Sequence, residues 1–293
     1  MNDNFQFEMT SFFNKRTIKN LHQEIQETYL CNNYPWVIGY SGGKDSTATV
    51  QLVWYALAEL PIAERTKQVF IISSDTLVET PVVVEQINST LKLIKERASL
   101  QGMPFTTHKV TPSVNESFWV RMIGMGYPAP TKRFRWCTDR MKIKPANTFV
   151  LETAAQFGEV VMILGARKSE SMSRAQVMNK REFLPGTHLS RHSSLPRAWV
   201  YTPIEDFITD DVWTYLLQVP SPWGASNRDL AAMYRSTQSG ECPLVVDNST
   251  PSCGNSRFGC WVCTVVDKDR TMQSLIDNGE EWMEPLLEFR EKL

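Results

Sequence analysis

Short apolar runs alternate along the chain with longer segments that carry apolar residues at helical spacing. The run at residues 68–74 is almost continuously apolar, as expected of a strand buried on both faces of a parallel sheet. The pattern therefore predicts an α/β fold with a doubly wound, mostly parallel, Rossmann-like sheet. The predicted strands are residues 37–38, 68–74, 105–110, 159–165 and 199–204, and the predicted helices are 15–29, 47–60, 81–101, 142–157 and one that starts at 209.

The order of these elements divides the chain into three predicted parts. Residues 1–34 form a helical lead-in, residues 35–235 form a nucleotide-binding domain, and residues 236–293 form a small C-terminal cysteine module. Cys31 follows the lead-in helix, and we interpret it as an ordinary, partly buried thiol.

A glycine-rich loop follows the first predicted strand and precedes a helix. Adjacent glycines let backbone N–H groups approach an anion closely, the helix N-terminus adds positive dipole, and a lysine adds a full charge. The loop lacks the glycine spacing and the final Ser or Thr of a Walker A motif. The sequence therefore predicts a phosphate-binding loop of another kind, formed by Ser41, Gly42, Gly43, Lys44, Asp45 and Ser46.

Further polar residues follow the second and fourth predicted strands, at the same edge of the sheet. Asp75 is either a cap for the next turn or a contact for adenosine. Arg167 and Arg174 suit a phosphate or an anionic substrate, and the alternative is a surface ion-pair cluster with Glu170. Asp45 is either a plain first-turn acid or a residue that helps to hold Mg²⁺ on the phosphates. The shared placement of these groups predicts a nucleotide site.

A basic segment with interleaved aromatic residues spans residues 131–144. It holds six basic side chains against one acid. Such a segment suits a single strand or a flipped nucleotide, and the alternative is a surface loop that binds only phosphates. Cys137 lies inside it, where basic neighbours are expected to lower the pKa of the thiol and form a thiolate that carries or attacks a persulfide. A simple buried thiol is the other interpretation.

Four cysteines lie close together near the C-terminus and end in a C-x-x-C pair. Such a group can surround one metal centre. Zinc ribbons usually pair two C-x-x-C knuckles, whereas only one occurs here, so the spacing favours a [4Fe–4S] cluster without excluding zinc. The predicted ligands are Cys242, Cys253, Cys260 and Cys263.

Composition narrows the class of protein further. The chain has 293 residues, of which 42% are hydrophobic, so it can bury a full core. Its net charge of −1 gives no overall attraction to nucleic acid or to an anionic membrane, and any basic surface must be local. No apolar run approaches the ~18 residues that span a bilayer, and the first residues lack a signal pattern. We expect a cytoplasmic protein whose cysteines serve metal or thiol chemistry.

The loop sequence SGGKDS at residues 41–46 resembles the PP-loop of ATP pyrophosphatases. Together with the runs ISSDTLVETP at 72–81, FRWCT at 134–138 and PSCGNSRFGCWVC at 251–263, it resembles the PAPS reductase-like branch of that family. More narrowly, the chain is similar to the DndC family of DNA phosphorothioation sulfurtransferases. The fold implied is that of the adenine nucleotide alpha hydrolases.

The resemblance implies that ATP and Mg²⁺ activate a DNA backbone phosphate by adenylation, that pyrophosphate is released, and that sulfur then replaces a non-bridging oxygen. It implies a [4Fe–4S] cluster on the four C-terminal cysteines and a cysteine desulfurase as sulfur donor. The implied catalytic residues are Lys44, Asp45, Arg167 and Cys137. Members of the family often extend further, so we expect DNA to be held mainly by partners such as DndD and DndE.

Three other functions stay open at this point. One is reduction of a free sulfonucleotide, which would release no pyrophosphate from ATP. Another is tRNA thiolation. The third is a non-catalytic DNA redox sensor that uses the cluster and keeps the loop as a nucleotide-binding module.

Overall fold

The computed structural model describes residues 10–236 and 259–293. Within them the chain forms a single sheet in the spatial order β3-β2-β1-β4-β6-β5. All neighbouring strands are parallel except the short edge strand β5, which pairs antiparallel with β6. The strands are β1 (Trp36–Gly39), β2 (Val69–Ser74), β3 (Phe105–Val110), β4 (Val160–Ile163), β5 (Ser190–Arg191) and β6 (Ala198–Tyr201).

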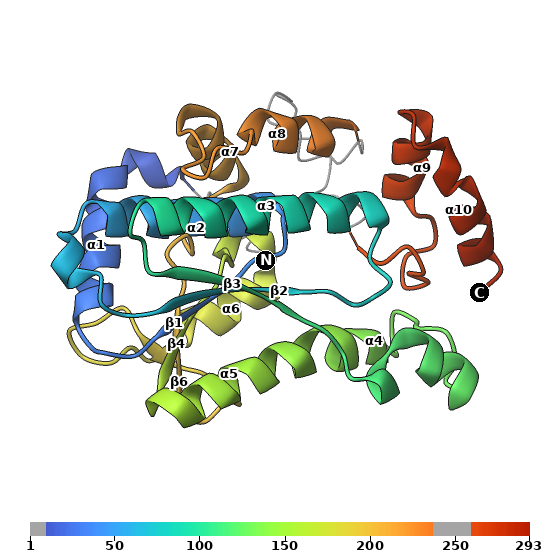
Figure 1. Cartoon of the computed structure of the whole chain (residues 1–293), viewed down its shortest axis with the longest axis horizontal. Coiled ribbons are helices and arrows are strands. Elements are labelled where there is room, and N and C mark those ends of the chain that lie inside the picture. The colour runs from blue at the N-terminus through green and yellow to red at the C-terminus, as the bar shows by residue number, and fades with distance from the viewer. Residues whose placement is uncertain (1–9, 237–258) are drawn as a thin grey trace, which may run out of the picture.

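Helices cover both faces of this sheet. In the described residues they are α1 (Ile18–Leu30), α2 (Lys44–Ala58), α3 (Pro81–Leu100), α4 (Trp136–Thr138), α5 (Lys144–Phe157), α6 (Met172–Asn179), α7 (Thr209–Gln218), α8 (Asn227–Ser236), α9 (Arg270–Asp277) and α10 (Glu284–Glu291). In Figure 1, α2 and α3 lie above the sheet and α5 lies below it. The predicted doubly wound, mostly parallel sheet is confirmed.

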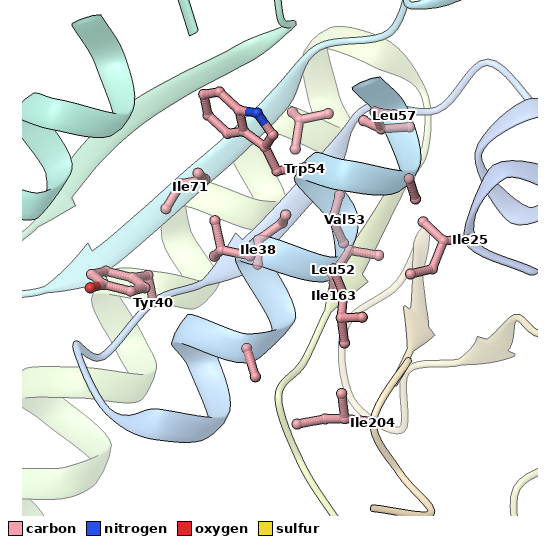
Figure 2. Packing of buried hydrophobic residues seen from close by; sticks show 14 of the residues in the cluster. Ile25, Ile38, Tyr40, Leu52, Val53, Trp54, Leu57, Ile71, Ile163 and Ile204 are labelled. Carbon is pink, nitrogen blue, oxygen red and sulfur yellow. The ribbon is translucent and has the colours of Figure 1, made fainter. Parts of the chain in front are cut away.

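Alternate residues of each central strand feed two separate apolar clusters, because successive side chains point to opposite faces. On β1, Trp36 and Ile38 join the large cluster with α1, α2, α3, α7 and α8. Val37 joins the smaller cluster, in which Val150 and Ala154 of α5 cover the other face. Figure 2 shows the side chains of α2 packed against Ile38 and Ile71 of the sheet.

Helix α1 contributes directly to the main core. Its residues Leu21, Ile25 and Tyr29 are fully buried there, and the hydroxyl of Tyr29 donates to the carbonyl of Lys67 at 2.9 Å. The helical spacing of these residues in the sequence thus identified the buried face. The division of the chain at residues 34 and 235 into three parts stays a prediction.

The last described segment lies beyond the carboxyl end of the strands. Figure 1 places α9 and α10 there, with α4 on the same side of the molecule. Cys260 forms an antiparallel bridge with Glu79, and the N–H of Trp261 donates to the carbonyl of Val78 at 3.0 Å. Val262 and Trp136 share a buried cluster with Val78. The end of the chain is therefore joined to the segment that follows β2.

None of the helices in residues 10–236 and 259–293 combines the length and apolar composition that crossing a bilayer requires.

Candidate nucleotide and cysteine site

The order of the strands creates a switch point between β1 and β4. From β1 the chain builds outward through β2 and β3, then returns to place β4 on the other side of β1. The loops that follow two strands at a switch point lead to opposite faces of the sheet, so a crevice opens between them. Open α/β sheets bind their ligands in this crevice. The loops after β1 and β4 carry the predicted residues 41–46 and Arg167.

The loop after β1 is shaped by two glycines. Gly42 has a φ of +74°, a conformation that residues with a side chain rarely adopt, and a Cβ there would lie 2.8 Å from Ile87. Gly43 is the N-cap of α2, and a Cβ on it would lie 3.0 Å from the hydroxyl of Tyr234. Helix α2 begins at Lys44, three residues before the predicted start at Thr47. The lysine is therefore part of the first helical turn.

The hydroxyl of Ser46 holds the loop together from within. It donates to the carbonyl of Gly43 at 3.0 Å and accepts from the backbone N–H of Ser41 at 3.2 Å. Ser46 is buried, whereas Ser41 is exposed. Ser46 therefore stabilises the shape of the cradle, and Ser41 lies at its open side.

Lys44 is 4% exposed and is surrounded by partners. Its ammonium nitrogen lies 3.3 Å from Oδ2 of Asp45 and 5.3 Å from the ring centroid of Tyr234. Its backbone N–H donates to the Tyr234 hydroxyl at 3.2 Å. Sequence reasoning missed Tyr234, which α8 brings to the loop from 190 residues away in the chain.

Arg167 reaches the loop from the end of β4 and is 2% exposed. Its Nε donates to Oδ1 of Asp45 at 2.6 Å, and its Nη1 donates to the hydroxyls of Ser169 at 2.8 Å and Thr209 at 3.2 Å. Gly165 allows this approach, because a Cβ there would lie 2.9 Å from the carbonyl oxygen of Asp45. The residues after β1 and β4 thus converge, and one carboxylate, that of Asp45, contacts both Lys44 and Arg167.

The structure favours the simpler interpretation of Asp75 and Arg174. Oδ1 of Asp75 accepts from the N–H of Leu77 at 2.9 Å, which caps the turn, and Oδ2 pairs with Lys109 at 2.7 Å. Arg174 pairs with Glu170 at 2.6 Å on a partly exposed surface. Contacts of Asp75 with adenosine and of Arg174 with a phosphate stay predictions, as does a role of Asp45 in holding Mg²⁺.

The basic segment at 131–144 is largely neutralised by acids from elsewhere. Glu116 pairs with three cations, and these pairs hold its pKa at about 2, with the hydrogen bond from Lys144 as the largest cause. The partners of Glu116 are Lys144 at 2.7 Å, Arg140 at 2.8 Å and Arg121 at 2.8 Å. Lys142 pairs with Glu79 at 3.0 Å and Lys132 with Asp267 at 2.9 Å. The segment is less positive than its own sequence indicates.

This neutralisation corrects the expectation for Cys137. Burial raises the pKa of its thiol above the ordinary value, and the basic neighbours that were expected to lower it are engaged with Glu116 and Glu79. Cys137 packs in the buried cluster that Cys260 also borders. A thiolate at Cys137 in the described structure is therefore not supported.

Three cysteines lie together at this end of the sheet. Cys137 and Cys260 border the same buried cluster, and the N–H of Cys263 donates to the carbonyl of Cys260 at 3.1 Å. The Cys260 sulfur lies 3.2 Å from the Thr76 hydroxyl. Burial raises the pKa of Cys260 to about 12. Thiols are the donor type that zinc and iron–sulfur centres use, so the group fits such a centre by its chemistry.

Two of the four predicted ligands, Cys242 and Cys253, lie outside the described residues. In residues 10–236 and 259–293, no three Cys, His, Asp or Glu side chains approach closely enough to hold a metal ion. The iron–sulfur module therefore stays a prediction.

Comparison with known proteins identifies the broad class. The family model described as the phosphoadenosine phosphosulfate reductase domain matches residues 35–265. An uncharacterised protein of Methanocaldococcus jannaschii is 24% identical over 278 residues, which are 94% of this chain and 45% of that protein. The chain thus spans less than half the length of this curated relative.

Two solved structures are similar at low identity. The tRNA thiolase NcsA of Methanococcus maripaludis, solved with its [4Fe–4S] cluster, is 13% identical with a TM-score of 0.43, over 94% of this chain and 76% of that chain. The phosphoadenylyl-sulfate reductase of Candida auris is 15% identical with a TM-score of 0.40, over 70% of this chain and 87% of that chain.

Proposed function

The chain belongs to the family of phosphoadenosine phosphosulfate reductase domains, and on this premise we propose that it is an ATP-dependent sulfurtransferase acting on DNA. A non-bridging oxygen of a backbone phosphate attacks the α-phosphorus of ATP. A new P–O bond forms, the bond to the bridging oxygen breaks, and pyrophosphate leaves with the electron pair. The terminal sulfur of a persulfide on the donor then attacks the acceptor phosphorus, and AMP departs with the original oxygen. An external thiol is the proposed reductant: it attacks the donor side of the new S–S bond, which leaves sulfur on the phosphorus and a disulfide between the thiol and the donor.

The main observation in support of this proposal is the ion pair between Arg167 and Asp45 beside the glycine loop, in which Nε lies 2.6 Å from Oδ1. Pyrophosphate release builds negative charge on the leaving group, and the transition state is stabilised by cations and N–H dipoles already in position. Lys44, Arg167 and the first-turn N–H groups of α2 supply such groups at the switch point. Asp45 orients both cations before a ligand arrives.

Sulfur chemistry is supported by the position of the cysteines. Thr76, whose hydroxyl contacts the Cys260 sulfur, follows directly on Asp75 at the end of β2. The thiols therefore lie at the same edge of the sheet as the loop. We propose that Cys242, Cys253, Cys260 and Cys263 hold an iron–sulfur centre, beside which Cys137 packs in the buried cluster that Cys260 borders. Such a centre would supply redox or sulfur-binding chemistry.

The sulfur donor and the partners are also proposed. Cysteines that hold an iron–sulfur centre are committed as its ligands. We therefore propose an external cysteine desulfurase as the source of the transferred sulfur. DndD and DndE are the proposed partners that present DNA.

One rival function is favoured by the family description, namely reduction of a sulfonucleotide. The two proposals differ in the fate of ATP. A sulfurtransferase of the proposed kind releases pyrophosphate when ATP and DNA are present. A reductase that acts on a ready-made sulfonucleotide releases none.

The test is pyrophosphate release by the full chain with ATP, Mg²⁺ and DNA. The Lys44→Ala variant should lose at least ~100-fold in rate, because a charge that stabilises the leaving group is removed. Lys92→Ala, at an exposed position on α3, is the matched control and should retain the rate. Equal rates of pyrophosphate release in Lys44→Ala and Lys92→Ala would show that Lys44 of the glycine loop has no part in the reaction. No release with any acceptor would favour the reductase.

A further inference from the structure

The turn at residues 131–135, which we call the basic turn, is held in a defined shape. The N–H of Thr131 donates to the carbonyl of Phe134 at 3.2 Å, and the N–H of Phe134 donates back to the carbonyl of Thr131 at 3.1 Å. Its base is fixed by Trp136, which is 6% exposed and donates from Nε1 to Pro128 at 3.0 Å. All five residues of the turn are exposed. The backbone of the turn is therefore held by hydrogen bonds and by the buried Trp136, while its side chains are exposed to solvent.

Two arginines of the basic turn lack an acidic partner within the described part of the chain. Each of the four other basic residues of segment 131–144 pairs with an acid; these are Lys132, Arg140, Lys142 and Lys144. Within residues 10–236 and 259–293, neither Arg133 nor Arg135 makes an ion pair. Once the paired groups are set aside, the positive charge of the segment is concentrated on these two residues.

An aromatic ring lies between the two arginines in the sequence. Phe134 is 45% exposed, and it stacks on Tyr127 with 6.4 Å between centroids and 25° between planes. Tyr127 is supported in turn by the guanidinium of Arg121 at 5.1 Å from its centroid. Stacking on Tyr127 fixes the orientation of the Phe134 ring, while nearly half of the Phe134 side chain stays accessible to solvent. An exposed, supported ring is a stacking surface for a base.

We propose that the basic turn binds a single-stranded segment of nucleic acid, with Arg133 and Arg135 on its phosphates and Phe134 stacked on a base. Guanidinium groups match phosphate oxygens, and base stacking on an aromatic ring is tolerant of sequence. The inference rests on the proposed function, because a strand held here lies beside Cys137, two residues further along the chain. An acidic protein partner would use the arginines but would gain little from Phe134.

The test is binding of labelled oligonucleotides of about 12 nucleotides to the full chain, by fluorescence anisotropy between about 50 and 200 mM salt. Single-stranded DNA, single-stranded RNA and duplex DNA are compared. The double variant Arg133→Gln/Arg135→Gln should reduce the slope of log affinity against log salt by about 1.4, at about 0.7 per phosphate contact. Phe134→Ala should weaken single-strand binding roughly tenfold with an unchanged slope.

A matched control removes two exposed charges elsewhere. Lys19→Gln/Lys92→Gln changes helices α1 and α3, and these residues also lack ion pairs in the described part of the chain. The control should keep the wild-type slope. ATP binding, measured separately, should be the same in all variants, which shows that each is folded.

Two results would overturn the inference. One is wild-type affinity and salt slope in both basic-turn variants. The other is competition by an acidic peptide together with no effect of Phe134→Ala, which would indicate a protein partner. Failure of the proposed function looks different. In that case the oligonucleotides still bind through the basic turn, but no pyrophosphate is released from ATP.

Discussion

The backbone N–H of Lys44 donates to the phenol oxygen of Tyr234, with 3.2 Å between nitrogen and oxygen. This N–H belongs to the first turn of α2, where a phosphate oxygen of a nucleotide would be expected to bind. If ATP binds this loop as proposed, its phosphate has to displace the Tyr234 hydroxyl from this N–H.

We predict that Tyr234→Phe binds ATP more tightly, by about two- to tenfold. The variant keeps the ring beside the Lys44 ammonium and removes only the competing oxygen, and a neutral hydrogen bond contributes about 0.5–1.5 kcal/mol. Isothermal titration with ATP measures the change. Tyr215→Phe is the control, because the Tyr215 hydroxyl is buried in α7 and finds no hydrogen-bond partner among the described residues. Weaker binding in Tyr234→Phe would mean that the hydroxyl contacts the ligand instead.

Gly165 provides a second prediction. An added Cβ would lie 2.8 Å from the Thr49 hydroxyl and 2.9 Å from the carbonyl oxygen of Asp45, so β4 and α2 would have to separate. We expect Gly165→Ala to lower the free energy of unfolding by about 1–3 kcal/mol and to slow pyrophosphate release, because Arg167 moves away from Asp45. Urea unfolding and the release assay measure the two effects. Gly39→Ala is the control, since nothing lies within 4 Å of a Cβ there.

The cysteines provide a third prediction. If Cys260 and Cys263 hold an iron–sulfur centre, Cys263→Ser should lose most of its iron and sulfide after anaerobic purification. Cys31→Ser should keep both, because Cys31 lies at the end of α1 and is exposed, not partly buried as predicted. Elemental analysis and the visible spectrum measure the iron and sulfide of the two variants. Full iron content in Cys263→Ser would separate this thiol from the centre, and zinc without sulfide in the wild type would replace the cluster with a structural metal site.

Glu116 provides a prediction of pH dependence. Its pKa is lowered to about 2 in the folded chain, first by the hydrogen bond from Lys144, whereas an unfolded glutamate titrates near 4.3. A lowered folded pKa means that the contribution is complete above the unfolded value and is lost as the pH falls through the folded value. We expect stability to fall between about pH 5 and pH 2, with Glu116 responsible for at most about 3 kcal/mol.

The measurement is urea unfolding of the wild type and Glu116→Gln at a series of pH values. The variant should be less stable at pH 7, because Lys144, Arg140 and Arg121 lose a charged partner. The difference should shrink as the wild-type carboxylate takes up a proton. A difference that stays constant down to pH 3 would assign the effect to packing alone.

The central strands of the sheet were predicted well from the sequence. A buried strand and the helix that follows it each have a characteristic pattern of apolar residues within a short stretch of chain. Strand β3 has the predicted bounds, and β2 begins one residue later than predicted, at Val69. The start of α2 was placed too late. Its N-cap, Gly43, makes no side-chain hydrogen bond, so the usual polar cap was absent and the first helical turn was interpreted as loop.

Contacts between distant segments could not be predicted in the same way. The three cations on Glu116 include Arg140 and Lys144, 24 and 28 residues further along the chain. The burial that raises the pKa of Cys137 likewise arises only when the chain folds. Tyr234 was missed for the same reason. A weak signal existed, since Leu230, Ala231 and Tyr234 have helical spacing and are buried in α8.

The pairing of residues 78–80 with 259–261 has a consequence for biosynthesis. Thr80 binds Gly259 across 179 positions of sequence, and Thr76 contacts Cys260 across 184. Contacts of such separation form only after most of the polypeptide has left the ribosome, whereas β1, β2 and β3 can associate much earlier. The loop at residues 41–46 is thus made in the first part of translation, and Cys260 joins the segment that follows β2 near the end. A nascent chain therefore forms its glycine loop before this cysteine is in place.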